Sequence, residues 1–293
     1  MTASVVIPKL NCRTVWLSDI HLGFKDCKAD YLLDFLESVE CETLYLLGDI
    51  VDLWSLKKSF FWPSSHYEVI KAIFKKAKTG TRVIYIPGNH DEPLRDYTDH
   101  DFGPIETRHE VIHTTADGKR LLLFHGDAMD AHIRFGRLSK MLGDTAYSFL
   151  LFINRWTNFA RQKCGFSYWS AACYLKSRVK NARVAINTFE TFAAHEAKRR
   201  KLDGVVCGHI HHAEIRHIDG VLYCNDGDWI ESCTALVEDQ QGHLEILHWS
   251  DRKHVVCTLI AANDDSQNLA DTDRLQEPSF DFSVNAVNKH TPL

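Results

Sequence analysis

Residue types that bind metal ions recur in this sequence at the ends of short apolar runs. Asp19 and His21 close the run TVWLSDIH, and His209 and His211 close the run GVVCGHIHH. Side chains at positions i and i+2 of a strand project to the same side, so each pair can reach one common point. A divalent cation at that point would offset the cost of burying a carboxylate and an imidazole. A local hydrogen bond would explain an isolated Asp-x-His without any metal.

Three further apolar runs end in the same way. TLYLLGD ends at Asp49, RVIYIPGNHD carries Asn89 and His90 near its end, and RLLLFHGD carries His125. In open α/β sheets, functional groups gather at the carboxyl ends of the strands. Five consecutive strand-like segments with such ends therefore favour one shared site over separate local hydrogen bonds.

The candidate ligands supply oxygen and imidazole nitrogen but no thiolate. Such a set suits hard or borderline ions such as Mn²⁺, Fe²⁺ or Zn²⁺. The residues are too many for one ion, so we predict two ions that share a bridging carboxylate. A pair of ions can clamp the attacking and leaving oxygens of a phosphoryl transfer and lower the pKa of a water molecule between them. The sequence therefore predicts hydrolysis of a phosphate ester or anhydride.

The elements that must position these residues alternate between strands and helices. The apolar runs are β-branched or aromatic at their centres and are closed by Gly, Asp or Asn, as strands are. Residues 29–39 and 66–78 instead carry apolar residues at helical spacing. This order predicts a parallel α/β arrangement for the first half of the chain.

Turn signals of the β-hairpin type appear later. Asp117-Gly118, Asp219-Gly220 and Gln241-Gly242 each separate two strand-like runs, including 234–239 and 243–249. We therefore expect added antiparallel strands and an α/β fold of two sheets packed face to face with helices outside.

Residues 130–201 contain no convincing strand. They are rich in aromatic residues and have a helical pattern, so we predict a helical insertion that caps the site. The predicted core comprises 1–129 and 202–261, and the polar residues 262–293 form a predicted mobile tail. The insertion has 14 Lys and Arg against 4 Asp and Glu, although the whole chain carries −5. This surplus suggests an anionic partner, or a solvated helical face, while the net charge argues against a nucleic-acid binder.

The compartment is predicted from cysteines and apolar runs. The nine cysteines form no C-x-x-C pair and several lie in apolar runs, which fits buried free thiols in a reducing compartment. The first residues lack the pattern of a signal peptide, and no run reaches the roughly 18 apolar residues of a membrane span. We therefore expect a cytoplasmic protein.

In this order, the motifs D-x-H, G-D-x-x-D, G-N-H-D, H-G-D and G-H-x-H resemble those of the calcineurin-like metallophosphoesterases. They span residues 19–211. The resemblance implies the two-sheet αββα metallophosphoesterase sandwich and a pair of divalent ions. It assigns one ion to Asp19, His21, Asp49 and His211, and the other to Asp49, Asn89, His125 and His209.

The same resemblance implies catalytic roles for His90 and Asp52. His90 would lie beside the scissile phosphate and stabilise its charge or protonate the leaving oxygen. In the phosphoprotein-phosphatase branch, an Asp at the position of Asp52 orients that His; the alternative is that Asp52 caps a helix. That branch continues with Arg-Gly and carries G-N-H-E, whereas Leu53-Trp54 and Asp91 stand here, which argues against a protein phosphatase.

The stretches LLGDIVDLW and GDWIESCTALVE resemble the UDP-2,3-diacylglucosamine hydrolases of lipid A synthesis. This resemblance implies that metal-activated hydroxide, with Mn²⁺ as cofactor, cleaves a pyrophosphate to give UMP and 2,3-diacylglucosamine 1-phosphate. It also implies peripheral attachment to the inner face of the inner membrane and a cap that holds the acyl chains. Many members carry Arg where His90 stands, so a relative acting on another nucleotide-linked or lipid phosphodiester is the alternative.

Substrate contacts are predicted at Asn89 and at the basic strip Lys176, Arg178 and Lys180. Apolar side chains of the insertion would hold acyl chains, at about 0.8 kcal/mol for each buried CH₂, or would form the insertion's own core. A nuclease is a rival enzyme, but it would present a broad basic groove around the metals. A scaffold without activity is a third reading, which the full set of ligands disfavours.

Overall fold

The computed structural model describes residues 9–132, 180–250 and 253–258. The predicted tail, and the predicted cap between residues 133 and 179, lie outside these residues.

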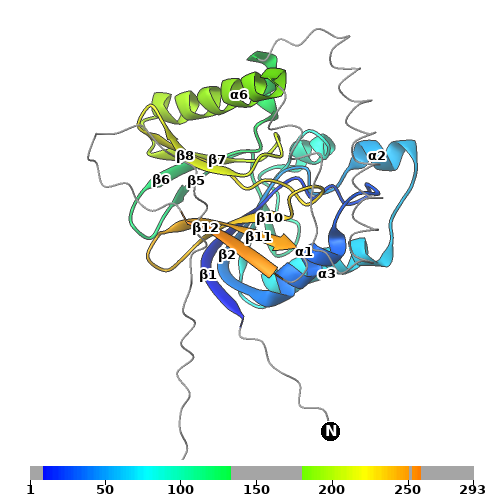
Figure 1. The fold of residues 1–293 in the computed structure, drawn as a ribbon. Coiled ribbons are helices and arrows are strands. Elements are labelled where there is room, and N and C mark those ends of the chain that lie inside the picture. The colour runs from blue at the N-terminus through cyan, green and yellow to red at the C-terminus, as the bar shows by residue number, and fades with distance from the viewer. Residues whose placement is uncertain (1–8, 133–179, 251–252, 259–293) are drawn as a thin grey trace, which may run out of the picture. The chain divides into compact units, whose positions relative to one another are not determined.

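The described strands form two mixed sheets (Figure 1). The first sheet contains β1 (Leu10–Leu17), β2 (Val39–Leu47), β3 (Arg82–Ile86), β4 (Ile105–Thr107), β10 (Thr234–Glu238), β11 (Leu244–Ser250) and β12 (Lys253–Thr258). The second contains β5 (Val111–Thr114), β6 (Arg120–Leu123), β7 (Gly204–Cys207), β8 (Glu214–Ile218) and β9 (Val221–Asn225). Their orders are β12-β11-β10-β1-β2-β3-β4 and β5-β6-β7-β9-β8. The strands β1 to β4 are parallel, as are β6, β7 and β9, and the others pair antiparallel.

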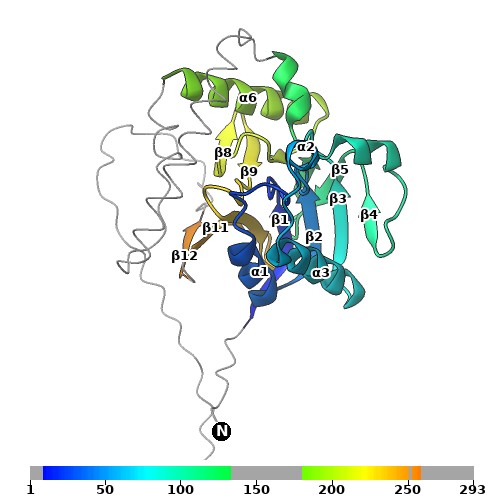
Figure 2. The ribbon, with the colours of Figure 1, turned by 90° about the vertical axis from the view of Figure 1, so that its right-hand side faces the viewer.

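Helices lie on the outer face of each sheet (Figures 1 and 2). The described helices are α1 (Ala29–Ser38), α2 (Leu53–Lys58), α3 (Ser64–Lys78) and α6 (Lys180–Arg199), with 3-10 turns η1 (Glu92–Tyr97) and η2 (Asp127–His132). The helices α1 and α3 pack against the first sheet and α6 against the second. The predicted αββα sandwich and the two predicted helices are confirmed; α2 and the strands β4 and β12 were not predicted.

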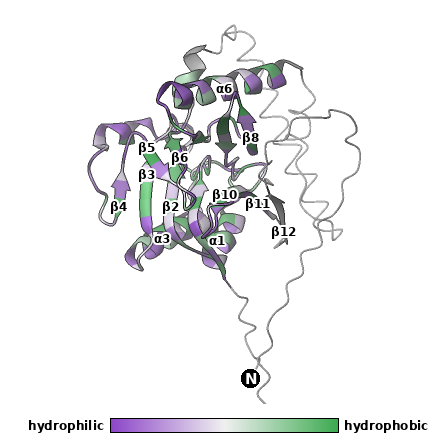
Figure 3. Cartoon of the chain, turned by 90° about the vertical axis from the view of Figure 1, so that its left-hand side faces the viewer, coloured by the Kyte–Doolittle hydropathy of each residue, from purple (hydrophilic) through white to green (hydrophobic). Residues whose placement is uncertain are grey.

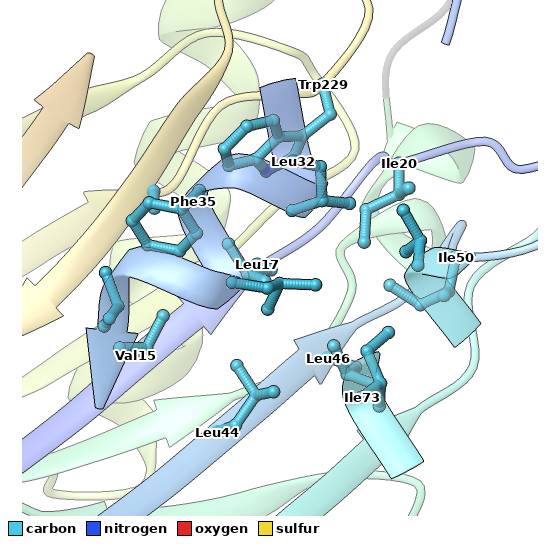
Figure 4. Packing of buried hydrophobic residues seen from close by; sticks show 14 of the residues in the cluster. Val15, Leu17, Ile20, Leu32, Phe35, Leu44, Leu46, Ile50, Ile73 and Trp229 are labelled. Carbon is cyan, nitrogen blue, oxygen red and sulfur yellow. The ribbon is translucent and has the colours of Figure 1, made fainter. Parts of the chain in front are cut away.

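Alternation along β1 explains why two packed layers meet on it. Val15 and Leu17 face the helical layer, where they pack with Leu32 and Phe35 (Figure 4). Trp16 points the other way, into the core between the two sheets. Burying each such side chain contributes about 1.5–3 kcal/mol. The second half of the strand, from Val15 to Leu17, is therefore apolar on both faces.

All three predicted turns join antiparallel strands. Asp117-Gly118 lies between β5 and β6, Asp219-Gly220 between β8 and β9, and Gln241-Gly242 between β10 and β11. The glycines have φ values of 90°, 82° and 90°. Such positive φ angles suit Gly, so the turn chemistry correctly located the hairpins.

Helix α6 falls within the predicted insertion but forms a layer of the sandwich. Phe189, Ala193 and Ala197 are buried against the second sheet. Figure 3 shows α6 as a mixture of hydrophilic and hydrophobic residues, typical of a helix with one face in the core. Among the described helices, none is long and apolar enough to cross a bilayer. Cys12, Cys207, Cys224 and Cys233 are buried free thiols, as predicted.

Candidate metal centre

The predicted ligands meet where the carboxyl ends of parallel strands in both sheets converge. Three groups of side chains each offer ligand atoms within 4.8 Å of one another. The groups are Asp19, His21 and His211; Asp49, His125 and His209; and His21, Asp49 and His90. Asp49 belongs to two of the groups, the place that a bridging carboxylate would take.

Distances within the centre show how closely the two sheets approach. Asp49 Oδ2 lies 3.4 Å from His125 Nε2 and 3.8 Å from His21 Nε2. Asp19 Oδ1 lies 3.2 Å from His211 Nε2 and 3.8 Å from His21 Nε2. Asp49 belongs to a loop of the first sheet and His125 to a loop of the second, so the sandwich must be complete before these atoms meet.

Asn89 joins the group around His125. Its Oδ1 atom lies 3.2 Å from His125 Nε2. A Cβ atom at the preceding residue, Gly88, would collide with Asp49 Oδ1. Only glycine therefore lets the loop after β3 approach the shared carboxylate this closely.

The backbone is left-handed at most of the predicted ligands. Asp19, His21, Asp49, His209 and His211 have φ values of 50°, 54°, 55°, 71° and 51°. Non-glycine residues rarely adopt this conformation, and it persists where surrounding structure enforces it, often at functional sites. Here it turns consecutive ligand side chains toward the space between the strand ends.

Buried polar atoms without hydrogen bonds test whether metal ions fit. Asp19 Oδ1, His21 Nε2 and His211 Nδ1 are all buried and make no hydrogen bond. Leaving such atoms unsatisfied is costly, and coordination would satisfy at least the first two, which point into the candidate ligand groups. Carboxylate oxygen with imidazole nitrogen suits hard or borderline divalent ions. The residues therefore fit a centre for two ions.

The charges of the centre reinforce one another. Burial lowers the pKa of His21, but the neighbouring carboxylates of Asp19, Asp52 and Asp49 raise it more, to about 10. Burial likewise opposes the effect of Asp49 on His125, whose pKa rises to about 10. Burial alone would raise the pKa of Asp49, but the effect of His125 is opposite and, together with that of His21, larger, so the pKa falls to about 2. The carboxylates thus attract cations, and binding of a metal ion must displace protons from the imidazoles.

His90 lies at the rim of the centre, in contact with Asp52. Its Nδ1 atom is 3.0 Å from Asp52 Oδ1, and its side chain is 24% exposed. Asp52 also accepts a hydrogen bond from the backbone N–H of Ser55 (2.7 Å) at the start of α2. The two readings of Asp52 are therefore compatible, since it caps a helix and contacts His90. The exposed ring of Trp54 contacts the His90 ring, with the two centroids 4.2 Å apart and the planes tilted by 34°.

Asp91 holds the loops of the centre together, a role that sequence reasoning missed. Its carboxylate accepts hydrogen bonds from the backbone N–H groups of Gly88 (2.5 Å) and Ile50 (2.8 Å) and from the Tyr85 hydroxyl. It thereby ties the loop after β3 to the loop that carries Asp49. Its position at the end of the G-N-H-D motif was the available signal.

Ser18 and Asp226 form a second support that was not predicted. The Ser18 hydroxyl contacts both Asp19 Oδ2 and Asp226 Oδ1, the latter at 2.7 Å. Burial raises the pKa of Asp226 well above its usual value. Asp226 directly follows β9, so the rule that located the ligands at strand ends could also have located this residue.

The predicted basic strip falls mostly outside the described residues. Lys176 and Arg178 precede the described part of α6, and Lys180 is its first residue. These substrate contacts remain predictions.

Two packed sheets with metal-ligand groups at their converging strand ends define a metal-dependent phosphoesterase. A family model, the calcineurin-like phosphoesterases, matches residues 12–213, and the chain belongs to that family.

Curated proteins and solved structures also show similarity to this chain. A UDP-2,3-diacylglucosamine hydrolase of Aliivibrio fischeri is 30% identical over 123 residues, which are 39% of this chain and 48% of that protein. One from Blochmanniella pennsylvanica is 26% identical over 121 residues, 40% and 48% of the two chains. The chain thus spans about half the length of the curated relatives it matches. Among solved structures, the E. coli phosphoesterase Yfce is 14% identical with a TM-score of 0.43, covering 84% of this chain and 98% of its own.

Proposed function

We propose that the chain hydrolyses the phosphoanhydride of UDP-2,3-diacylglucosamine to UMP and 2,3-diacylglucosamine 1-phosphate. The observation that carries the reaction class is the convergence of ligand groups around Asp49. The substrate is supported by the partial similarity to two hydrolases of that name. Such a substrate would bring the protein to the inner face of the inner membrane as a peripheral protein.

Mn²⁺ or a similar ion would be held by the predicted ligands at the strand ends. Two divalent ions held there would supply Lewis acidity toward phosphoryl oxygens and would lower the pKa of bound water. The chain itself must hold the phosphoryl group in line with that water. The amide of Asn89 lies at the edge of the centre and can donate a hydrogen bond to a phosphoryl oxygen.

His90 provides the proton-transfer group in this proposal. It lies beside Asp49, with Nε2 4.0 Å from Asp49 Oδ2, and its partly exposed ring can face a substrate. Asp52 Oδ1 lies 3.0 Å from Nδ1, which leaves Nε2 as the atom that can donate a proton to a leaving oxygen. Protonation of that oxygen by a positioned imidazole typically contributes 10²–10⁴-fold to rate.

A second candidate is hydrolysis of another nucleotide-linked or lipid phosphodiester. The presence of His90 where many UDP-2,3-diacylglucosamine hydrolases carry Arg favours it, because an imidazole can serve an ester whose leaving oxygen requires a proton. An Arg at that place would contact the phosphate without acting as an acid.

The two candidates are separated by one comparison of substrates. Purified protein with Mn²⁺ is incubated with UDP-2,3-diacylglucosamine or with bis(p-nitrophenyl) phosphate, and UMP or p-nitrophenol is measured. We expect UMP, with a higher kcat/KM than for the simple diester. Turnover of the diester without UMP would remove the glycolipid substrate and retain the reaction class; turnover of neither would remove both.

A further inference from the structure

A polar cavity of about 240 Å³ borders the metal centre on the side of His125. Its walls come from the loop after β3, the turn η1, the segment before β5, the loop after β6 and the end of α6. Pockets that hold drug-sized ligands have about 300–1,000 Å³. This cavity can therefore hold one part of a substrate whose phosphoryl group lies at the metals.

Two fixed guanidinium groups line the cavity. Arg95 donates to Asp127 Oδ1 at 2.7 Å and to the carbonyl of Pro87 at 3.2 Å. Arg200 donates to Glu196 Oε1 at 2.7 Å and also contacts Glu110. Each guanidinium is thus held in one orientation by a carboxylate, and neither needs a ligand to stay in place.

The charges of the lining argue against two kinds of occupant. The cavity has three carboxylates, of Glu110, Asp127 and Glu196, and only two guanidinium groups. Because each guanidinium is already paired with a carboxylate, an added phosphate would meet no open basic group among them. Binding of an acyl chain in the cavity would be unfavourable, because the chain would displace water from the charged groups without offering them hydrogen bonds.

A neutral group rich in hydrogen-bond donors and acceptors does fit this lining. The carboxylates can accept from hydroxyl and ring N–H groups, and the guanidinium groups retain N–H donors for carbonyl oxygens. Phe124 and His109 add two flat rings to the wall. Flat apolar surface beside fixed polar groups is typical of sites for heterocycles.

We propose that this cavity holds the nucleoside moiety of a nucleotide-linked substrate while the adjoining phosphate lies at the metal centre. The inference rests on the proposed function and deepens it, because it assigns the nucleotide half of the substrate to the side of His125. Arg95, Arg200 and their carboxylate partners then determine specificity for the nucleoside.

The test compares the affinities of three product-like ligands for the Mn²⁺-loaded protein, measured by calorimetry. UMP, ribose 5-phosphate and inorganic phosphate share a phosphate and differ in what is attached to it. We expect UMP to bind at least about tenfold more tightly than ribose 5-phosphate. Ala128→Trp fills the cavity from an exposed position in η2 and should remove that difference while leaving the affinity for inorganic phosphate unchanged.

Two further variants keep the result interpretable. Ala116→Trp places the same side chain at an exposed position in the β5–β6 turn and should bind all three ligands as the wild type does. Arg200→Gln removes a guanidinium without filling the cavity. It should weaken the binding of UMP about fivefold or more and leave the binding of inorganic phosphate unchanged. Equal affinities of the wild type for UMP and ribose 5-phosphate, or equal weakening of all three ligands by Ala128→Trp, would overturn the proposal.

Failure of this inference differs from failure of the proposed function. Protein that releases UMP from UDP-2,3-diacylglucosamine yet binds UMP no more tightly than ribose 5-phosphate keeps the function and lacks the nucleoside site. Protein that binds UMP through the cavity but leaves the glycolipid intact keeps the nucleoside site and loses the glycolipid substrate.

Discussion

Two buried clusters of carboxylate and histidine lie along β1, one beyond its carboxyl end and one beside its middle, and they differ in how completely their polar atoms are hydrogen-bonded. At the carboxyl end, the metal centre combines left-handed backbone with polar atoms that make no hydrogen bond. Beside Thr14, in the middle of the strand, Glu238 is fully buried and both of its carboxylate oxygens accept hydrogen bonds. The same residue types therefore serve two purposes within one strand length.

The cluster around Glu238 is complete by itself. Its Oε1 accepts from Arg13 (2.8 Å) and from the N–H of Ala116 (2.7 Å). Its Oε2 accepts from the Thr14 hydroxyl (2.6 Å) and lies 3.0 Å from His113 Nε2. Most of these residues lie in regular strands, so the cluster joins the two sheets without local strain.

The contrast indicates what marks a functional cluster in this fold. A satisfied polar network contributes to stability and offers nothing to a ligand. The metal centre keeps like charges close together, adopts unfavourable φ angles and leaves ligand atoms open, all of which a bound cation would relieve. We therefore expect changes in the metal centre to affect activity and changes around Glu238 to affect stability.

Asp49→Asn should give the largest effect. Loss of the shared carboxylate would weaken both metal positions, and kcat/KM toward bis(p-nitrophenyl) phosphate should fall about 10³-fold or more. Asn tolerates left-handed φ and can still accept the backbone N–H of His90, so the variant should keep the fold, although the metal-free protein loses the charge that His21 and His125 face. Wild-type turnover by this variant would contradict the assignment of Asp49.

Glu238→Gln should produce the reverse pattern. Removing the charge that Arg13 and His113 face should lower the free energy of unfolding by about 3 kcal/mol, measured by urea denaturation. Activity of the folded variant should stay within about twofold of the wild type, since no predicted ligand contacts this cluster. Glu37→Gln, at an exposed position, is the matched control and should stay within about 0.5 kcal/mol.

Added Mn²⁺ should separate the clusters directly. At a free concentration of about 100 times Kd, it should stabilise the wild type by about 2.7 kcal/mol. Because His21 and His125 have pKa values of about 10 in the metal-free protein, binding of Mn²⁺ must release protons. At one fixed free Mn²⁺ concentration, the stabilisation should therefore grow as pH rises from 6 to 8. Glu238→Gln should keep this response and Asp49→Asn should lose it; an equal response in both variants would place the ion elsewhere.

His90 should matter in proportion to the proton that the leaving group needs. His90→Ala should lower kcat for an alkyl phosphodiester about 100-fold. Its effect should be about tenfold with bis(p-nitrophenyl) phosphate, because p-nitrophenolate leaves without protonation. His90→Arg should preserve KM, and its loss of kcat should depend on the leaving group as that of His90→Ala does. Equal losses for both esters would indicate that His90 acts on phosphoryl charge rather than as an acid.

His66 should give the smallest effect, and one that depends on pH. Its Nδ1 accepts the backbone N–H of Gly23 (2.9 Å), which holds the loop after Asp19 and His21. Burial lowers the pKa of His66, so its stabilising contribution is present above the unfolded pKa of about 6.5 and is lost as pH falls below it. Between pH 7.5 and 5.5, wild type should lose about 1 kcal/mol more than His66→Gln. Parallel stability curves would contradict this role.

Much of the fold could be predicted because its signals are local. Gly and Asp-Gly turns end the strands, and apolar spacing marks α1 and α3. The strand β4 and the helix α2 escaped because three and six residues carry too little periodicity. The place of α6 in the sandwich was also not predicted, since the sequence pattern of its apolar face is the same whether the helix covers a sheet or packs within a separate insertion.

The sequence by itself determined which residues could bind metal ions and that they would stand at strand ends, because residue type and turn chemistry are properties of short segments. Only the tertiary structure decided that Asp49 of one sheet meets His125 of the other, that Asp91 and Asp226 support them, and that Arg95 and Arg200 enclose a cavity beside them. These contacts depend on how two sheets and a distant helix pack, and packing between segments far apart in the chain leaves no periodic trace in any one of them.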